Sequence, residues 1–416
     1  MARILVVGGS LGGLMAANLL LRAGHEVQLL ERSRHSLSGR GAGIVTHDSL
    51  RTALHAAGVA AEAPLGVAVG SRVALDPQGQ VLCRWDYPQV LASWGRLYEL
   101  LLQALPAGRC RFGAPVAAVE QGEPGVTARL ADGQSLQADL LVAADGLRST
   151  VRAQLAPAVQ PAYAGYVAWR GLCDEGCLSR HTRQTLFGHF GFGLPEGEQM
   201  LGYPVAGGGG GVRAGAGERA WNFVWYRPAA AGPELAALLT DADGLHHPEG
   251  IAPQQVSWRQ IAAMRAAARE RLAPQFAEIV EKTAQPFVQP IVDLVSPRMA
   301  WGRVALLGDA AMVARPHVGL GVTKAGDDAL ALAESIAALG ATPAALARYE
   351  ARRLAAGAAV VERSRRLGAY LQARGGAPSR HPHERSAEAV LRQTAIDPRL
   401  FDPESERSTP EATAAP

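Results

Sequence analysis

The chain has few cysteines, few aromatic residues and almost no lysine. Four cysteines are scattered over its 416 residues, which excludes a disulfide framework and leaves no ligand cluster for a zinc ion. Only 6% of the residues are aromatic, so alanine, valine and leucine must build most of the core. The formal charge is +3, and no cluster of basic residues provides a nucleic-acid-binding face. We therefore expect neither a metal site nor a nucleic-acid partner.

Long apolar runs are also missing. No stretch of about 18 apolar residues is free of charge and glycine, so no membrane span is expected. The first apolar strand is expected at Arg3–Val7, which leaves no room for a signal peptide before it. These absences predict a cytoplasmic protein. The length predicts two or three domains, or one large domain with an insertion.

The first 31 residues have the pattern of a strand, a glycine-rich turn, a helix and a second strand. Gly8, Ser10 and Gly13 occupy the three small positions of a dinucleotide-binding turn, with Ser10 in place of the usual middle glycine. Such a turn brings a pyrophosphate to a helix N-terminus. Glu31 ends the second strand, where an acid can bind a ribose hydroxyl. The alternative is a glycine turn with a purely structural role.

Later segments predict an α/β fold with an insertion. Ala138–Asp145 and Arg303–Asp309 are apolar runs that return to the first, Rossmann-like domain. Between them, Tyr163–Arg170, Thr185–Phe192 and Trp221–Tyr226 alternate apolar and polar residues, which is typical of antiparallel strands. We interpret this part as an inserted, mainly antiparallel β-sheet domain that covers a substrate pocket. The expected parts are residues 1–160 and 296–375 for the Rossmann-like domain, the second part including C-terminal helices, 161–295 for the sheet domain, and 376–416 for an arm or tail.

Two further motifs carry a resemblance to a known family. Asp145-Gly146 is followed by Ser149 and by Val151-Arg152, and Gly308-Asp309-Ala310-Ala311 is followed by a proline, two glycines and Asp327-Asp328-Ala329. With the glycine turn, these motifs resemble the class A FAD-dependent aromatic hydroxylases, the para-hydroxybenzoate hydroxylase family, and among them the dihydroxypyridine hydroxylases. Three positions depart from the family pattern: Met312, Leu320 and Thr323 stand where His, Gln and Asn are usual.

The resemblance implies a non-covalently bound FAD and NAD(P)H as a co-substrate. A ribityl hydroxyl of the flavin is expected at Asp309, and the helix that follows Gly321 is expected to point its N-terminus at the flavin ring. Arg32 is a candidate for stacking on the adenine, with a solvated surface position as the alternative. The candidate cofactor residues are Gly8, Ser10, Gly13, Glu31, Arg32, Arg40, Arg96, Asp145, Asp309, Gly319, Gly321, Val322 and Thr323.

The activity implied by the resemblance is a monooxygenase reaction. NAD(P)H reduces FAD, and a flavin C4a-hydroperoxide formed with O2 hydroxylates a small hydroxylated aromatic or heteroaromatic ring, hydroxypyridine-like or phenolic. His317 and His47 are candidate catalytic residues because imidazole titrates near neutral pH, although a single histidine is more often structural. A homodimer is a further expectation. The candidate substrate-binding residues, each of which can instead be part of the core, are Tyr166, Trp169, Tyr203, Trp225 and Pro316.

Two alternatives from other classes stay open. The chain can be an FAD-dependent reductase or oxidase that inserts no oxygen, or a flavoprotein that sequesters a ligand without catalysis. The first would consume NAD(P)H or substrate without a hydroxylated product, and the second would bind a ligand without stimulating NAD(P)H consumption.

Overall fold

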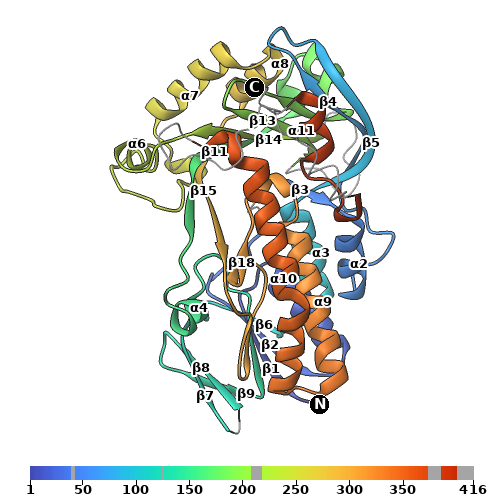
Figure 1. Cartoon of the computed structure of the whole chain (residues 1–416), viewed down its shortest axis with the longest axis vertical. Coiled ribbons are helices and arrows are strands. Elements are labelled where there is room, and N and C mark those ends of the chain that lie inside the picture. Colours follow the sequence, from blue (N-terminus) through green and yellow to red (C-terminus); the bar gives the residue numbers. More distant parts are fainter. Residues whose placement is uncertain (39–42, 124, 208–217, 373–385, 401–416) are drawn as a thin grey trace, which may run out of the picture.

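The structure is a computed structural model that describes residues 1–38, 43–123, 125–207, 218–372 and 386–400. Two large sheets lie one above the other in the view of Figure 1. Helices α9 (Gly321–Leu339) and α10 (Pro343–Gly368) run side by side along the lower one. Within the described residues, none of the helices combines the length and apolarity needed to cross a bilayer.

The lower sheet has six strands and forms the Rossmann-like part of the molecule. β1 pairs in parallel with β2 and β10, and β10 pairs in parallel with β17. The two later apolar runs therefore return to this sheet as predicted. Their apolar residues are buried because helices pack on the sheet. In spatial order the strands are β16 (Ala300–Trp301), β17 (Val304–Leu306), β10 (Leu140–Ala143), β1 (Arg3–Val7), β2 (Glu26–Glu31) and β6 (Cys110–Phe112).

Helices with clear start and stop signals pack against this sheet. α1 (Leu11–Arg22) ends just before Gly24, whose φ of 85° few other residues adopt. α10 begins after Thr342, whose hydroxyl accepts a hydrogen bond from the amide of Ala345, and Pro343 fits its first turn. The other helices of this part are α2 (Asp48–Ala56), α3 (Trp94–Ala104) and α4 (Thr150–Leu155).

The upper sheet has nine strands and is larger than the sequence predicts. All its neighbouring strands are antiparallel except β12 and β4. Four of its strands lie outside the expected range of 161–295. They are the hairpin of β4 and β5, the short β3, and β18, and they extend the sheet at its two edges. In spatial order the strands are β18 (Met312–Val313), β15 (Phe287–Val295), β11 (Ala162–Asp174), β14 (Arg219–Pro228), β13 (Gln199–Ala206), β12 (His189–Gly193), β4 (Val67–Leu75), β5 (Val81–Ser93) and β3 (Gly43–Thr46).

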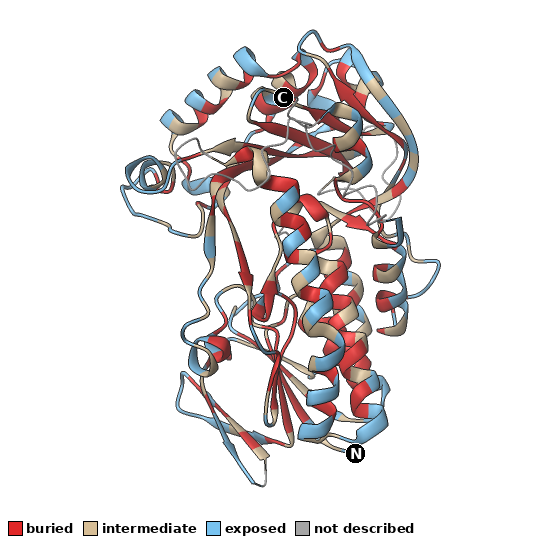
Figure 2. Ribbon diagram, in the orientation of Figure 1, coloured by how far each residue is buried: buried red, intermediate tan, exposed pale blue. Residues whose placement is uncertain are grey.

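One face of the upper sheet is covered by helices, which we call the helix-side face. Part of the strand predicted over Thr185–Phe192 is helical, because the Ser179 hydroxyl caps a helix by accepting from the amide of Thr182. Figure 2 shows the sheet buried beneath the covering helices, with the outer side of α7 (Trp258–Arg271) exposed. The covering helices are α5 (Arg180–Leu186), α6 (Pro233–Leu238), α7 (Trp258–Arg271) and α8 (Pro274–Lys282).

The opposite face of the upper sheet contacts the segment that follows the Gly-Asp motif, through Tyr166 and His317, and we call it the motif-side face. Part of it is covered by the C-terminal segment, which was predicted to be an arm or tail. Residues 386–400 pack on the sheet, and Val390 and Leu391 in α11 (Ala387–Gln393) are buried. The remaining elements are a three-stranded sheet of β7 (Val116–Gly122), β8 (Gly125–Leu130) and β9 (Ser135–Ala138), and the short helices η1 (Glu175–Cys177), η2 (Pro253–Gln255), η3 (Gly308–Ala310), η4 (Pro316–Val318), η5 (Ala369–Leu371) and η6 (Pro398–Leu400).

Candidate active site

The glycine turn after β1 is as tight as its sequence suggests. Gly8 has a φ of 102°, and a Cβ atom on Gly13 would lie 1.9 Å from the carbonyl oxygen of Gly8. Ser10 precedes α1 without capping it through its side chain, and the first turn of α1 holds no acidic residue. The N–H groups of this helix end are therefore open to an anion such as a pyrophosphate.

Glu31 closes the second strand beside this turn. Its carboxylate is buried and accepts hydrogen bonds from the amides of Gly9 and Ser33, both at 2.7 Å. These contacts fix an acid at the position where a ribose is expected. The neighbouring Arg32 is exposed, and together with burial its charge lowers the pKa of Arg148.

The Asp-Gly motif is joined to the Gly-Asp motif by a buried arginine. Burial raises the pKa of Asp145, whose Oδ2 accepts from the amide of Val151 at 3.3 Å. Arg152 donates to the carbonyl oxygens of Leu147 and of Ala310, the second at 3.0 Å. The sequence motif includes Arg152 but does not indicate its role. In the structure, its two hydrogen bonds link the Asp-Gly motif to the Gly-Asp motif.

Charged side chains of α9 and α10 hold the Gly-Asp motif against α9. The Lys324 ammonium donates to the carbonyl oxygen of Gly308 at 2.9 Å, and Asp328 accepts from the amide of Gly308 at 3.2 Å. Arg353 completes the group by donating to Asp328 at 2.7 Å. Asp309 itself is accessible to solvent, although the protein on its other sides raises its pKa. In the sequence, the feature that indicates these ionic contacts is Asp328, the second aspartate of the Asp-Asp-Ala motif.

The N-terminus of α9 is a second open helix end. Leu320 precedes it without a side-chain cap, and a Cβ atom on Gly321 would meet none of the described residues within 4 Å. Gly319 has a φ of 63°, which turns the chain from η4 into the helix. Val322 follows Gly321, and the Thr323 hydroxyl lies 3.2 Å from Nδ1 of His47. The two open helix ends, with buried Glu31 and accessible Asp309, have the donors and acceptors that FAD needs.

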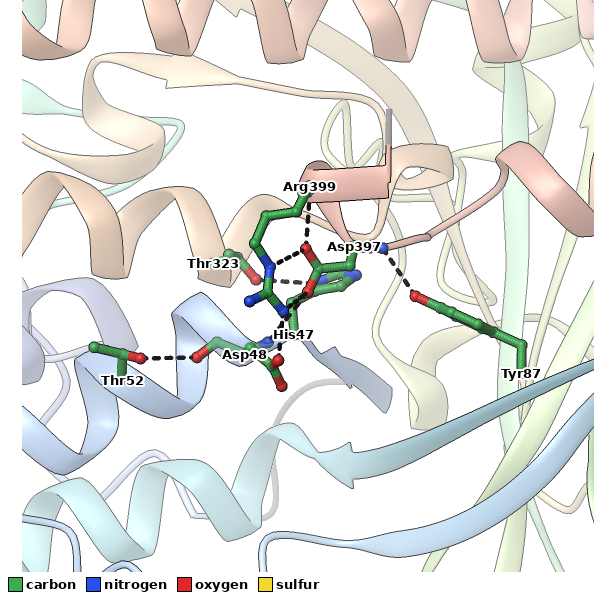
Figure 3. A network of polar contacts seen from close by, with 7 residues as sticks. All are labelled: His47, Asp48, Thr52, Tyr87, Thr323, Asp397 and Arg399. Carbon is green, nitrogen blue, oxygen red and sulfur yellow. Dashed lines mark hydrogen bonds and ion pairs between the residues drawn. The ribbon is translucent and has the colours of Figure 1, made fainter. Parts of the chain in front are cut away.

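His47 is buried where β3 meets α2. Burial lowers its pKa to about 4, so the imidazole is neutral near neutral pH and is a weak base. Asp397, from the C-terminal segment, accepts from the amide of Asp48 at 3.4 Å at the start of α2, and Arg399 pairs with both carboxylates (Figure 3). A pocket of about 540 Å³ lies here, and Tyr87 forms part of its wall.

His317 also lies on the motif-side face, in a cluster of tyrosines. The Tyr166 hydroxyl is 2.9 Å from Nε2 of His317, and the ring centre of Tyr226 is 4.3 Å from that of the imidazole. Tyr203 lies on the same face, so close to Gly43 that a Cβ atom there would be 2.3 Å from its ring. The structure thus brings Tyr166 and Tyr203 to one face, as the predicted pocket requires.

Trp169 and Trp225 belong to the opposite, helix-side face. Both are buried in the cluster that includes Phe276 of α8, and the Trp225 indole donates to Glu198 at 2.9 Å. Side chains alternate along a strand, so Trp169, three residues beyond Tyr166, points to the other face. The expectation that these two tryptophans line the pocket is therefore not supported, and we regard them as core residues.

Three candidate residues from the sequence remain to be located: Arg96, Pro316 and Arg40. Arg96 lies in the first turn of α3, and its Nε donates to the carbonyl oxygen of Pro64 at 3.1 Å. Pro316 begins η4, beside His317. Arg40 lies outside the described residues.

A buried arginine fixes the C-terminal segment to the motif-side face. Arg72 of β4 donates to the carbonyl oxygens of Leu391, Thr394 and Ala395 and also to the side chain of Gln89. Ala395 then donates to the carbonyl oxygen of His317 at 2.9 Å. The segment is therefore a wall of the candidate site, which the polar composition of the last residues did not reveal.

Comparisons with known proteins agree with this geometry. A family model described as "FAD binding domain" matches residues 1–170 and 251–364, and one described as "FAD binding domain-like" matches residues 163–293. The chain is 33% identical to 2,6-dihydroxypyridine 3-monooxygenase of Paenarthrobacter nicotinovorans, over 89% of this chain and 91% of that protein. It is 32% identical to aurachin C monooxygenase/isomerase of Stigmatella aurantiaca, over 88% of each. The solved structure of 2,6-dihydroxypyridine-3-hydroxylase from Arthrobacter nicotinovorans superposes with a TM-score of 0.83 at 31% identity, covering 92% of this chain and 98% of that one.

Proposed function

Since this chain belongs to the class A FAD-dependent aromatic hydroxylases, we propose that it uses NAD(P)H and O2 to hydroxylate a small hydroxylated ring, hydroxypyridine-like or phenolic. The observation that carries the proposal is a sheet face with tyrosines and a histidine, Tyr166, Tyr203, Tyr226 and His317, in which His317 lies just before Gly319 at the turn into α9. The similarity to a dihydroxypyridine monooxygenase over most of both chains supports the same substrate class.

The protein's own residues bind the cofactor and enclose the ring. Bound FAD supplies the redox chemistry and the activation of oxygen. The open N-terminus of α1 would hold the pyrophosphate and Glu31 the adenosine ribose, while Asp309 and the N-terminus of α9 would hold the ribityl chain and the flavin ring. The further residues that we assign to the cofactor are Gly8, Ser10, Gly13, Arg32, Arg40, Arg96, Asp145, Gly319, Gly321, Val322 and Thr323.

Proton transfer from the substrate hydroxyl is best placed at His317. Its Nε2 shares a hydrogen bond with the Tyr166 hydroxyl, and this pair can pass a proton while both groups stay in position. Pro316 lies beside it and would contact the ring. His47, whose pKa is lowered to about 4 by burial, is better suited to orient Thr323 than to accept the proton.

The test is an oxygen-labelling assay on the purified, FAD-loaded protein. Hydroxypyridines, phenols and quinolones would be screened for stimulated NADH or NADPH oxidation. The reactions would be repeated under labelled O2, and the product masses would be measured by mass spectrometry. One labelled oxygen atom in the product is the expected result. Stimulated oxidation that yields only peroxide would favour a reductase or oxidase. Ligand binding without stimulated oxidation would favour the ligand-sequestering flavoprotein.

The homodimer and the cytoplasmic location stay predictions. Light scattering on the purified holoprotein tests the first, and fractionation of the producing cells tests the second. A monomeric holoprotein with full activity would contradict the dimer.

A further inference from the structure

The motif-side face carries a positive charge that no described group balances. Arg170 stands on β11, opposite Val224 of β14 and Phe287 of β15, and its side chain is partly exposed. Its Nε atom is buried and has no hydrogen-bond partner in the described part of the chain. No ion pair with a described carboxylate forms there either, so the guanidinium depends on solvent or on a ligand.

Two other buried arginines of this chain have acceptors for their guanidinium groups. Arg315 pairs with Asp293 at 2.8 Å, and Arg72, on the same face as Arg170, binds three backbone carbonyl oxygens and Gln89. Taking a guanidinium out of water is costly unless charges or acceptors replace the water. Among the described residues, Arg183 of α5 also has a buried Nε without a partner, but it lies on the helix side. Arg170 lacks such partners on the motif-side face, near Tyr203 and Tyr226, and so indicates a missing acceptor there.

A second donor without a partner lies beside Arg170. The Asn222 side chain is 1% exposed, and its Oδ1 accepts from the amide of Gly43 at 3.1 Å. This contact fixes the orientation of the amide, so Nδ2 is the remaining donor, and it has no partner among the described residues. Asn222 is two residues from Val224, the register partner of Arg170. Such diagonal neighbours lie about 7–8 Å apart in an antiparallel sheet, within reach of one aromatic ring.

The nearby tyrosines do not balance the charge. Burial raises the pKa of Tyr226 to about 12, and it also raises the pKa of Tyr203, although Arg170 acts in the opposite direction on both. Both phenols are therefore neutral near neutral pH. They can donate hydrogen bonds to a ligand, but the negative charge must come from the ligand itself.

We propose that Arg170 and Asn222 form an anion anchor that selects aromatic substrates with a negatively charged oxygen. The guanidinium binds that oxygen, and the Asn222 amide donates to it or to an adjacent oxygen. The oxygen belongs either to a ring carboxylate or to an ionised ring hydroxyl. The inference rests on the proposed function for the statement that the ligand is the substrate, and it makes Arg170 a specificity-determining residue.

The test compares charged and neutral members of matched pairs. Oxidised holoenzyme at pH 8, without NAD(P)H, would be titrated with 6-hydroxynicotinate against 6-hydroxynicotinamide, and with 4-nitrophenol against 4-nitroanisole, while the flavin absorbance is followed. We expect the wild type to bind the anion of at least one pair about tenfold or more tightly than its neutral partner. The pair that shows the preference distinguishes a carboxylate from an ionised hydroxyl.

Variants then locate the preference. Arg170→Gln is expected to weaken binding of the anion by about tenfold or more and to leave the neutral partner unchanged, while Arg170→Lys keeps part of the preference. Arg227→Gln is the matched control, because Arg227 lies on the same sheet and pairs with Glu198 on the helix side at 3.1 Å. FAD content and thermal unfolding show whether each variant is folded.

The outcomes separate this proposal from the proposed function. Equal affinity for both members of each pair, no binding of either anion, or an unchanged preference in Arg170→Gln overturns the anchor. Labelled oxygen in a neutral ring would leave the monooxygenase standing without the anchor. An anion preference that depends on Arg170, with no hydroxylated product from any ring, would leave the anchor and remove the monooxygenase.

Discussion

The two sheets of this molecule present their functional groups in different ways. In the six-stranded sheet the candidate groups lie at strand ends, where Gly8, Glu31 and Asp309 accompany the carboxyl ends of β1, β2 and β17. In the nine-stranded sheet they lie along the strands, where Tyr166 and Arg170 alternate with core residues. Function at the first sheet depends on backbone turns, and function at the second depends on which face a side chain occupies.

The largest effect, on FAD affinity, is expected where a substitution places a side chain inside a turn at the end of a strand. Gly13→Ala would place a Cβ atom 1.9 Å from the carbonyl oxygen of Gly8, so the turn must open. We expect FAD affinity to fall by about a thousandfold, roughly 4 kcal/mol, measured by flavin titration of the apoprotein. Gly12→Ala is the control, because its Cβ atom would meet only side chains, the nearest that of Leu307 at 3.1 Å. Equal flavin affinity of Gly13→Ala and wild type would contradict a backbone-built site.

The next largest effect, on the free energy of unfolding, is expected on the helix-side face of the upper sheet. Trp225→Ala removes a fully buried indole and should cost about 3 kcal/mol or more of unfolding free energy, measured by urea denaturation. Trp258→Ala, at a side chain that is 76% exposed, should cost little. If Trp225→Ala instead weakened substrate binding while stability stayed at the wild-type value, the assignment of Trp225 to the core would be wrong.

The contrast between the sheets also explains what the sequence reveals. Gly8, Gly13, Glu31 and Asp309 follow or end apolar runs with fixed spacing, so the local chain already determines their place. The expected α/β fold and the FAD-binding part follow from such local patterns, and both are confirmed. Aromatic residues in a strand give no such information, and Trp169 was grouped with the pocket although strand alternation excludes it from that face.

Other differences arise from long-range pairing. The hairpin of β4 and β5 joins a sheet whose other central strands follow about 70 residues later or more, and nothing in its own sequence specifies that partner. The docking of residues 386–400 depends on Arg72, which lies more than 300 positions earlier in the chain. Unpaired donors such as Arg170 are recognised only when every neighbour is known.

The free energy of unfolding should depend on pH through His47, which lies where the motif-side face meets α9. His47 has a pKa of about 4 when folded and 6.5 as a free side chain, because burial disfavours its charged form. Above pH 6.5 both states are neutral and the group has no effect. Between pH 6.5 and 4 the unfolded chain takes up a proton that the folded chain does not, so stability falls with pH by up to about 3 kcal/mol.

The measurement is urea denaturation of His47→Gln and wild type at pH 7 and pH 4.5. The wild type should lose more stability between the two values than the variant does, and His35→Gln, at an exposed position, should behave as wild type. Parallel losses in His47→Gln and wild type would show that His47 does not control this part of the pH dependence.

A smaller effect is expected at the clamp on the C-terminal segment. Arg72→Gln removes the donors to the carbonyl oxygens of Leu391 and Ala395 and should cost about 2 kcal/mol. The loss should be local, so protease cleavage within residues 386–400 should accelerate while the six-stranded sheet remains protected. Arg84→Gln, which breaks an exposed pair with Asp86, is the control. Cleavage at the wild-type rate in Arg72→Gln would mean that burial of α11 alone holds the segment.

The smallest effect on stability, and the most direct test of the motif-side face, is Tyr166→Phe. The substitution keeps the buried ring and removes one hydrogen bond to Nε2 of His317, so unfolding free energy should fall by about 1 kcal/mol. If the pair handles the substrate proton, hydroxylation should fall more than FAD binding, and the pH profile of turnover should shift because the imidazole has lost a partner. Tyr226→Phe is the matched control for unfolding free energy, since the described residues form no hydrogen bond with its hydroxyl and its ring packs on the same imidazole. A wild-type pH profile in Tyr166→Phe would leave His317 as part of the packing of this face, because a proton acceptor must respond to the loss of the group that orients it.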